Sequence, residues 1–482
     1  MFDTSWVSTS ATITQVAEAF AVHENTVRVT IGTDLIDSLT SAPTRTATQL
    51  LASTVNLAAV IPTALSAAPS AVAPAVAPAV DPQQVVPQQV GDPVSLASLT
   101  GLTLLQQLAL LQPAALSDFV ASNPEVVQQL IDAPPAAREV QLWWTALDID
   151  ARSDLLTSAP RIVGNLEGVP FGLRDTANRT YLTATMVALS TAADGGRSAA
   201  LDASTQLRML QKVTEALVAP AGAPARHLLS LDPAGAGTAS IVIGDLSSAD
   251  YVSILVPGMF YTVDGQMAAW TTAAQSLYDE QVTWVSELGL GGTVATVAWI
   301  GYETPSLVNF TSLDLAYEGS DALAASVAGL HSLRGDSQPY IALVAHSYGS
   351  TAAMMALTNY GIDIDSIGII GSPGSSAQLA TDLGVPGDSV YVGEADWDQI
   401  KDSAFFGSDP GSASFGAHHF RVNGGIDPLT GQTLLGSTGH DEYLKVGSES
   451  LRNLALIALG QGRLITTDDA ATAVKSSTDY SH

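Results

Sequence analysis

The chain has 482 residues, more than one typical domain, and its 18 Lys and Arg against 47 Asp and Glu give a formal net charge of -29. Such a surface repels phosphate backbones and anionic lipid headgroups, so nucleic acid is excluded as an expected partner. The chain has no cysteine, which excludes a disulfide framework, a thiolate nucleophile and a zinc–thiolate site.

The first 93 residues predict a small helical region followed by a spacer. Apolar residues between 13 and 61 recur at mixed helical spacing, so we predict an N-terminal helical region over 1–61. Residues 62–93 are mostly Ala, Pro, Val and Gln, a composition typical of an extended linker. No signal peptide is predicted, and prolines interrupt the uncharged stretch between Arg45 and Asp81, which argues against a membrane span there. We therefore expect a soluble protein, cytoplasmic or exported, with no integral membrane segment.

Residues 94–225 predict a helical lead-in or cap, because no strand-like alternation interrupts them. The expected helices cover 102–111, 125–131, 136–147 and a long stretch over 181–217, with an N-cap at Ser117 or Asn123. The adjacent Trp143 and Trp144 lie in this region. Paired tryptophans are more often packed than ligand-binding, so we expect them in a core or at a domain interface.

From about residue 226 the pattern changes to short β-branched runs that alternate with helices. Apolar runs of this length are what a sheet buried on both faces requires. The expected strands are 241–244, 252–256, 293–299, 341–345, 367–370 and 390–393, and the expected helices are 267–288, 320–333, 350–359 and 448–459. This alternation predicts an α/β domain over 226–465, with a mostly parallel sheet flanked by helices, followed by a C-terminal tail over 466–482.

The sharpest local signal is the run Ala-His-Ser-Tyr-Gly at 345–349, directly after an expected strand and directly before an expected helix. That context is typical of a nucleophile elbow, in which a serine sits on a strained turn between closely packed elements. Ala345 replaces the usual first glycine, and Gly349 is retained. The pattern predicts Ser347 as the nucleophile of a serine hydrolase.

A serine hydroxyl needs a base near neutral pH, and the hydrolase chain order places that base downstream of the nucleophile. Four histidines qualify by position. His482 is terminal, and His418 and His419 adjoin an expected strand over 420–422, whereas His440 lies in a turn-rich loop ahead of the last helix. We favour His440, because such a loop can display a side chain toward a pocket.

The acid is expected after the strand 390–393, where the loop 394–400 offers three carboxylates. Asp398 is the first choice because it lies past the strand end and leads into an apolar residue. Asp396 stays open as a competitor, because the geometry of a loop does not follow from residue spacing.

Two backbone amides should form an oxyanion hole. One is expected from Tyr348, which follows the nucleophile, and the other from Met259 or Gly258 in the loop after strand 252–256. Tyr302 and Glu303 follow another strand at the same sheet edge and could line the pocket. The alternative, which stays open at this point, is that Tyr302 packs in the core and Glu303 is solvated.

Further motifs give the chain a family resemblance over about 123–459. They are the Trp143-Trp144 pair, the run Gly-Asn-Leu-Glu-Gly-Val-Pro at 164–170 with Arg174 and Asn178, Pro257-Gly258, Trp-Ile-Gly-Tyr at 299–302 with Pro305, the elbow, and Gly-Ser-Pro-Gly at 371–374. In this order they resemble a little-characterised, actinobacterial branch of the α/β-hydrolase superfamily, catalogued as a domain of unknown function.

The resemblance implies that Ser347, Asp398 and His440 are nucleophile, acid and base of an esterase or lipase-like enzyme. The expected substrate is a small-molecule ester, and no cofactor or metal is expected. Two alternatives stay open at this point. One is an acyltransferase with the same three residues, and the other is a non-catalytic cell-surface or interaction module on a hydrolase scaffold.

Overall fold

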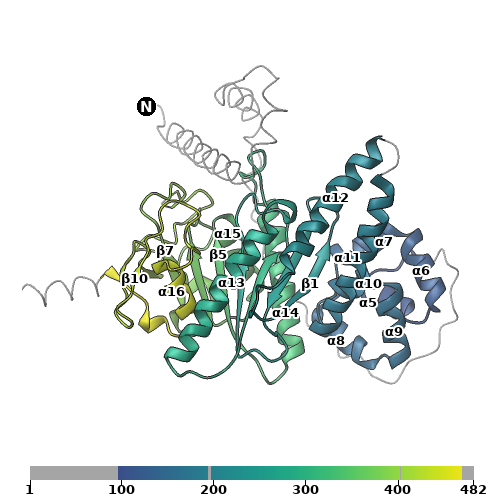
Figure 1. Ribbon diagram of the computed structural model, residues 1–482, viewed down its shortest axis with the longest axis horizontal. Coiled ribbons are helices and arrows are strands. Elements are labelled where there is room, and N and C mark those ends of the chain that lie inside the picture. The colour runs from purple at the N-terminus through teal and green to yellow at the C-terminus, as the bar shows by residue number, and fades with distance from the viewer. Residues whose placement is uncertain (1–95, 194–196, 402, 469–482) are drawn as a thin grey trace, which may run out of the picture. The chain divides into compact units, whose positions relative to one another are not determined.

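The computed structural model describes residues 96–193, 197–401 and 403–468 (Figure 1). The predicted helical region 1–61, the linker 62–93 and all but the start of the tail 466–482 lie outside the described residues. Within the described ranges, no helix has the length and apolar character needed to cross a membrane.

An eight-stranded sheet forms the centre of the molecule, in the order β1-β2-β4-β3-β5-β6-β7-β8. β2 is antiparallel to β1 and β4, and every other neighbouring pair in this sheet is parallel, as an α/β fold requires. The strands are β1 (Arg226–Asp232), β2 (Thr238–Ile243), β3 (Tyr251–Val256), β4 (Val294–Ile300), β5 (Tyr340–His346), β6 (Ser366–Ile370), β7 (Val390–Gly393) and β8 (His418–Phe420).

The six predicted strands are confirmed, and two further strands complete the sheet. β1 was not predicted, because the polar ends Arg226 and Asp232 shorten its apolar run. β8 lies two residues before the strand predicted at 420–422, because His418 pairs with Tyr391 of β7. A two-stranded hairpin of β9 (Gly425–Ile426) and β10 (Thr433–Leu434) was also not predicted.

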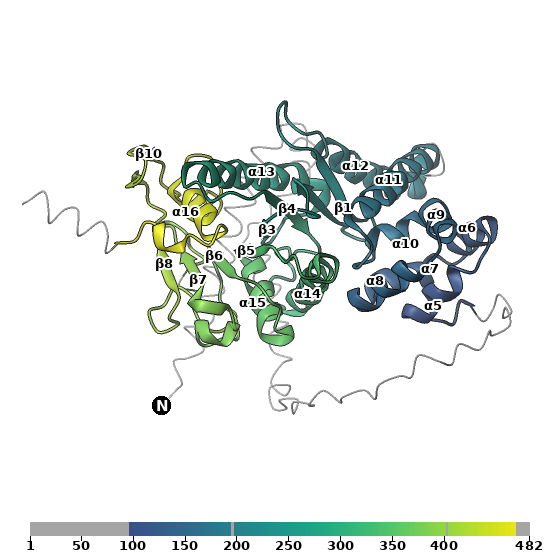
Figure 2. The same cartoon turned by 90° about the horizontal axis from the view of Figure 1, so that it is seen from below.

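Helices cover both faces of the sheet (Figure 2). One face carries α14 (Asp314–Arg334) and α15 (Tyr348–Tyr360). The other carries α13 (Val263–Glu287) and α16 (Glu449–Ile457), together with residues of α11 (Phe171–Ala193) and α12 (Arg197–Ala216). Each face has its own buried apolar cluster, which explains why the central strands are apolar on both sides.

The helices that precede α11 form a separate small core. It is built from apolar residues spaced along each helix and includes Trp143 and Trp144, whose rings meet edge to face at 5.9 Å. These two tryptophans are therefore core residues, as expected. The helices are α5 (Gly101–Leu108), α6 (Pro113–Ser122), α7 (Pro124–Asp132), α8 (Ala137–Ala146), α9 (Ile149–Ser158) and α10 (Pro160–Asn165).

Two details of the helical prediction are wrong, and the N-cap at Asn123 is confirmed in position. Ser117 lies inside α6 and caps nothing. Asn123 stands at the N-cap position of α7, but its side chain donates to the carbonyl of Phe119 and so satisfies the end of α6. The stretch predicted as one helix over 181–217 is divided between α11 and α12.

The motif at 164–178 joins these helices to the sheet. Arg174, almost fully buried, pairs with Glu167, and Asn178 donates to the carbonyls of Gly164 and Leu228 at 2.9 and 3.0 Å. These polar residues therefore have structural partners. Because α11 and α12 share their apolar core with the sheet, the division at 225/226 into lead-in and catalytic domain stays a prediction.

Candidate active site

Ser347 occupies the corner between β5 and α15 with φ 55° and ψ -133°, a conformation that L-residues rarely adopt. Its amide donates to the carbonyl of Ile370 at 3.0 Å, which helps to hold this strained turn. A Cβ on Gly349 would lie 2.3 Å from the carbonyl oxygen of Pro257, so only glycine lets the start of α15 approach the loop after β3. The sharp turn predicted from the sequence is present.

The structure brings Ser347, His440 and Asp398 together. The Ser347 hydroxyl donates to Nε2 of His440 at 2.7 Å, and Nδ1 of His440 lies 3.0 Å from both carboxylate oxygens of Asp398. Because a carboxylate only accepts, the ring proton sits on Nδ1 and leaves Nε2 free to accept from the serine. The three residues come from the loops after β5 and β7 and from the loop before α16.

The competing residues are placed elsewhere. Asp396 is exposed, whereas Asp398, two residues on, is 4% exposed. His418 and His419 lie on the edge strand β8 with exposed side chains. His482 lies outside the described residues.

Burial and the charges of the two groups on each other set the pKa values of Asp398 and His440. Burial favours the neutral form of the Asp398 carboxyl, but the His440 charge and hydrogen bonds from His440, Tyr443 and the Ile400 amide outweigh it and hold its pKa well below the usual range. Burial lowers the pKa of His440, and the charge and hydrogen bond of Asp398 reverse this, so the net shift is upward. The carboxylate thus stabilises a protonated imidazole.

This upward shift predicts the acidic limb of the pH profile. If His440 is the base, it must be neutral to accept a proton, so kcat/KM should rise with pH through a pKa above the ordinary 6.5. Initial rates from about pH 4 to 9 with one ester measure this limb. A rate that stays constant down to pH 5 would contradict the assignment of His440.

His346 is a neighbour of this pair that the sequence did not single out. Its Nε2 donates to the backbone carbonyl of His440 at 2.7 Å, and the two rings lie 4.6 Å apart. Burial, and then the charge of His440, lower the pKa of His346 to about 4, so it stays neutral while His440 titrates. Its partner is a main-chain atom 94 residues away, which no sequence pattern indicates.

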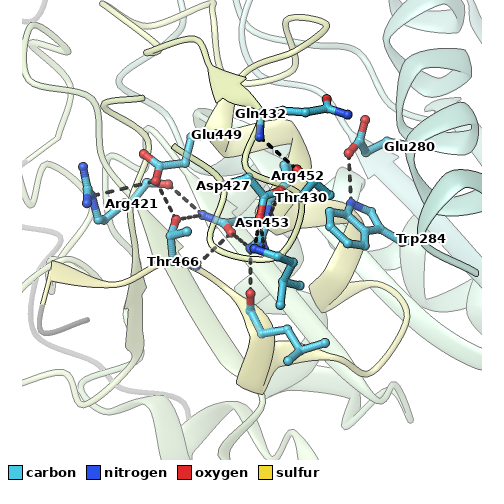
Figure 3. A network of polar contacts seen from close by, with 12 residues as sticks. Glu280, Trp284, Arg421, Asp427, Thr430, Gln432, Glu449, Arg452, Asn453 and Thr466 are labelled. Carbon is cyan, nitrogen blue, oxygen red and sulfur yellow. Dashed lines mark hydrogen bonds and ion pairs between the residues drawn. The ribbon is translucent and has the colours of Figure 1, made fainter. Parts of the chain in front are cut away.

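A buried polar network anchors the segment between β8 and α16 that carries His440 (Figure 3). Arg452 of α16 binds both carboxylate oxygens of Asp427 at 3.1 and 3.2 Å, and its guanidinium lies 5.1 Å from the Trp284 ring centroid. Asn453 donates to the carbonyl of Arg421, and Glu449 accepts from the amide of Gly424. Because this segment has little regular structure of its own, these contacts fix its path on α16.

The candidate oxyanion donors lie around the serine. Gly258 packs so closely that a Cβ there would lie 3.0 Å from the Ser347 hydroxyl oxygen. The amide of Phe260 donates to the carbonyl of Pro305 at 3.0 Å, so Gly258 and Met259 are the candidate donors of this loop. The choice between Gly258 and Met259 therefore stays open.

Tyr302 packs in the core and Glu303 is solvated, which is the alternative to their lining a pocket. Tyr302 is buried, stacks on Trp299, and donates its hydroxyl proton to the carbonyl of Pro257 at 2.7 Å. Glu303 is exposed. Tyr302 thus supports the loop that carries Gly258 and Met259. Among the described residues, no group of His, Asp and Glu side chains could hold a metal ion.

Comparison with known proteins bears on the fold and on the family. Residues 232–408 match the family described as alpha/beta hydrolase. Two uncharacterized proteins of Mycobacterium tuberculosis are each 27% identical over 406 residues, which is 72% of this chain and 59% of theirs. The match thus spans about three-fifths of the length of these relatives.

One similar solved structure is a carboxyl esterase of Tuber melanosporum, which is 13% identical in sequence. The match covers 50% of this chain and 87% of the esterase, with a TM-score of 0.29. Another is an esterase of Pyrobaculum calidifontis, with 13% identity, coverage of 58% and 96%, and a TM-score of 0.32. The match over residues 232–408 and the mostly parallel sheet with helices on both faces show an α/β-hydrolase fold, and the similarity to the mycobacterial relatives agrees with the resemblance to an actinobacterial branch of such proteins.

Proposed function

We propose that this chain is a serine hydrolase that cleaves carboxylic esters, with Ser347 as nucleophile, His440 as base and Asp398 as acid. One observation carries the proposal: an unbroken chain of hydrogen bonds runs from the Ser347 hydroxyl through the His440 ring to the Asp398 carboxylate. A serine with this support is what acyl transfer needs, because the hydroxyl must lose its proton as it attacks.

In the first half of the reaction, Ser347 Oγ attacks the ester carbonyl carbon while Nε2 of His440 takes the hydroxyl proton. The tetrahedral intermediate collapses when His440 gives this proton to the departing alkoxide, which leaves as the alcohol. In the second half, His440 removes a proton from water, the hydroxide attacks the acyl-serine, and Ser347 leaves with the proton returned. Asp398 stabilises the imidazolium in both halves.

The negative oxygen of the intermediate would be held by the amide of Tyr348 and that of Met259 or Gly258. Tyr348 is the first residue of α15, where the helix dipole favours negative charge. The loop from Pro257 to Met259 packs directly against Ser347 and Gly349, so a second donor from this loop is close at hand.

Reaction with a fluorophosphonate probe tests the proposal. We expect the probe to label the wild-type protein at Ser347 and to leave Ser347→Ala unlabelled. Ser350→Ala is the control: it replaces a buried serine one helical turn from Ser347, and we expect it still to react. Absence of labelling in the folded wild type would favour a non-catalytic module instead.

A p-nitrophenyl ester series from acetate to palmitate then defines the acyl preference. An open pocket predicts faster turnover of short chains, and an apolar channel predicts faster turnover of long ones. Product analysis with a competing alcohol distinguishes hydrolysis from acyl transfer, because a transferase would yield the new ester rather than the free acid.

A further inference from the structure

The hydroxyl of Tyr443 contacts the same carboxylate of Asp398 that His440 contacts. It donates to Oδ2 of Asp398 at 2.7 Å and accepts from the amide of Ala395 at 2.9 Å. The direction of both bonds is fixed, because an ionised carboxylate only accepts and an amide only donates. Tyr443 is 1% exposed, so no bulk solvent competes for these contacts.

Tyr443 joins two loops that are distant in the sequence. It follows His440 by three residues, whereas Ala395 and Asp398 belong to the loop after β7. The remaining contacts of the carboxylate are with the amide of Ile400 at 2.9 Å and with Nδ1 of His440. Each carboxylate oxygen is thus held by a donor besides His440, which fixes the carboxylate plane relative to the ring.

We propose that Tyr443 is a positioning residue, which holds Asp398 in the orientation that His440 requires and withdraws part of its negative charge from the histidine. The proposal rests on the serine hydrolase function proposed above. Removal of the hydroxyl would leave more of the carboxylate charge directed at His440, so the imidazolium would be more stable and the base harder to regenerate.

The charged surroundings support this assignment. Burial, and then the charge of Asp398, raise the pKa of Tyr443 well above its ordinary value, so the hydroxyl stays a proton donor. Two other titratable groups lie around His440. Asp441 raises the pKa of His440, and the pKa of His346 is itself lowered to about 4. Glu394 acts on Tyr443 and raises its pKa. All three groups are present in both the wild type and Tyr443→Phe, so the comparison of the two proteins isolates the hydroxyl.

Tyr443→Phe tests the proposal, because it keeps the ring and removes only the hydroxyl. We expect kcat on a p-nitrophenyl ester to fall roughly tenfold, with KM within about twofold, since a hydrogen bond to a charged group is lost. The acidic limb of kcat/KM should move to higher pH. Tyr340→Phe is the matched control, because Tyr340 is a partly buried tyrosine at the opposite end of β5 from Ser347.

A double-mutant cycle with Asp398→Asn separates positioning from packing. If Tyr443 acts through Asp398, its substitution should change kcat much less in the Asp398→Asn background. An equal loss in both backgrounds, or an unmoved acidic limb, would overturn the proposal. If Tyr443→Phe does not fold, Tyr443→Met replaces it, because it also removes the hydroxyl and its flexible apolar side chain can fill the buried site, and the same loss of kcat and shift of the acidic limb are expected.

A measurement without turnover keeps this proposal distinct from the proposed function. NMR titration of ¹⁵N-histidine, with the His440 signal assigned by its loss in His440→Gln, reports the pKa of His440 directly. A higher pKa of His440 in Tyr443→Phe supports the withdrawal of charge through Asp398, and so the proposal, even if no ester is cleaved. An unchanged pKa in a protein that does cleave esters refutes the positioning role alone.

Discussion

Replacement of His440 by alanine is expected to lower kcat by about ten thousandfold to a millionfold, with a far smaller change in KM. The reason is that Ser347 Oγ donates to Nε2 of His440 at 2.7 Å, and in the described part of the chain no other imidazole contacts that oxygen. Without a base the hydroxyl has to attack while still protonated. The measurement is steady-state hydrolysis of the best p-nitrophenyl ester of the series.

The controls for this experiment are His418→Ala and His419→Ala. Both histidines lie downstream of the nucleophile, but on the exposed edge of β8, so we expect wild-type rates from both variants. A His440→Ala variant that folds and keeps more than a tenth of the wild-type kcat would show that another group serves as base. Circular dichroism and thermal melting establish that each variant is folded.

Much of this site followed from local sequence, because its key parts are local. The elbow at Ser347 needs a strand, a serine with small residues close by and a helix in direct succession, and all of these are visible within residues 341–359. The fold class followed from the alternation of buried strands and helices. His440 was favoured by its turn-rich loop, and the structure brings it to the serine.

The choice between Asp398 and Asp396 could not be made from sequence. Both lie in an irregular loop, where no periodicity fixes the direction of a side chain, and only the packed structure turns Asp398 inward while Trp397 stays 78% exposed. The contacts of His346 and Tyr443 were invisible for a related reason. Each joins segments more than 40 residues apart, through a backbone carbonyl or a single hydroxyl.

Gly371, which follows β6, has a role that sequence reasoning also missed. Its φ is 56°, and a Cβ built on it would lie 2.7 Å from Oδ2 of Asp398 and 3.0 Å from Nδ1 of His440. These atoms belong to the contact between Asp398 and His440. A methyl group at this position therefore competes for space with that contact, and the absence of a side chain lets it form.

We therefore expect Gly371→Ala to lower kcat by roughly a hundredfold or more, because displacement of a catalytic group by about 1 Å costs that much. Gly361→Ala is a close control. Gly361 has the same φ of 56°, follows the far end of α15, and has no atom within 4 Å of its built Cβ. Both substitutions impose the backbone strain of about 1–2 kcal/mol, but only Gly371→Ala adds the clash.

The comparison separates strain from geometry. Both variants should lose some thermal stability. Only Gly371→Ala should also lose kcat, because only there does the new methyl group disturb the contact between Asp398 and His440. Its NMR titration should also show a lower pKa for His440, because an imidazole moved away from Asp398 keeps the desolvation that lowers its pKa and loses the charge that raises it. Equal kcat in the two variants would mean that the contact between Asp398 and His440 tolerates this displacement, and that the serine depends less on the acid than the geometry implies.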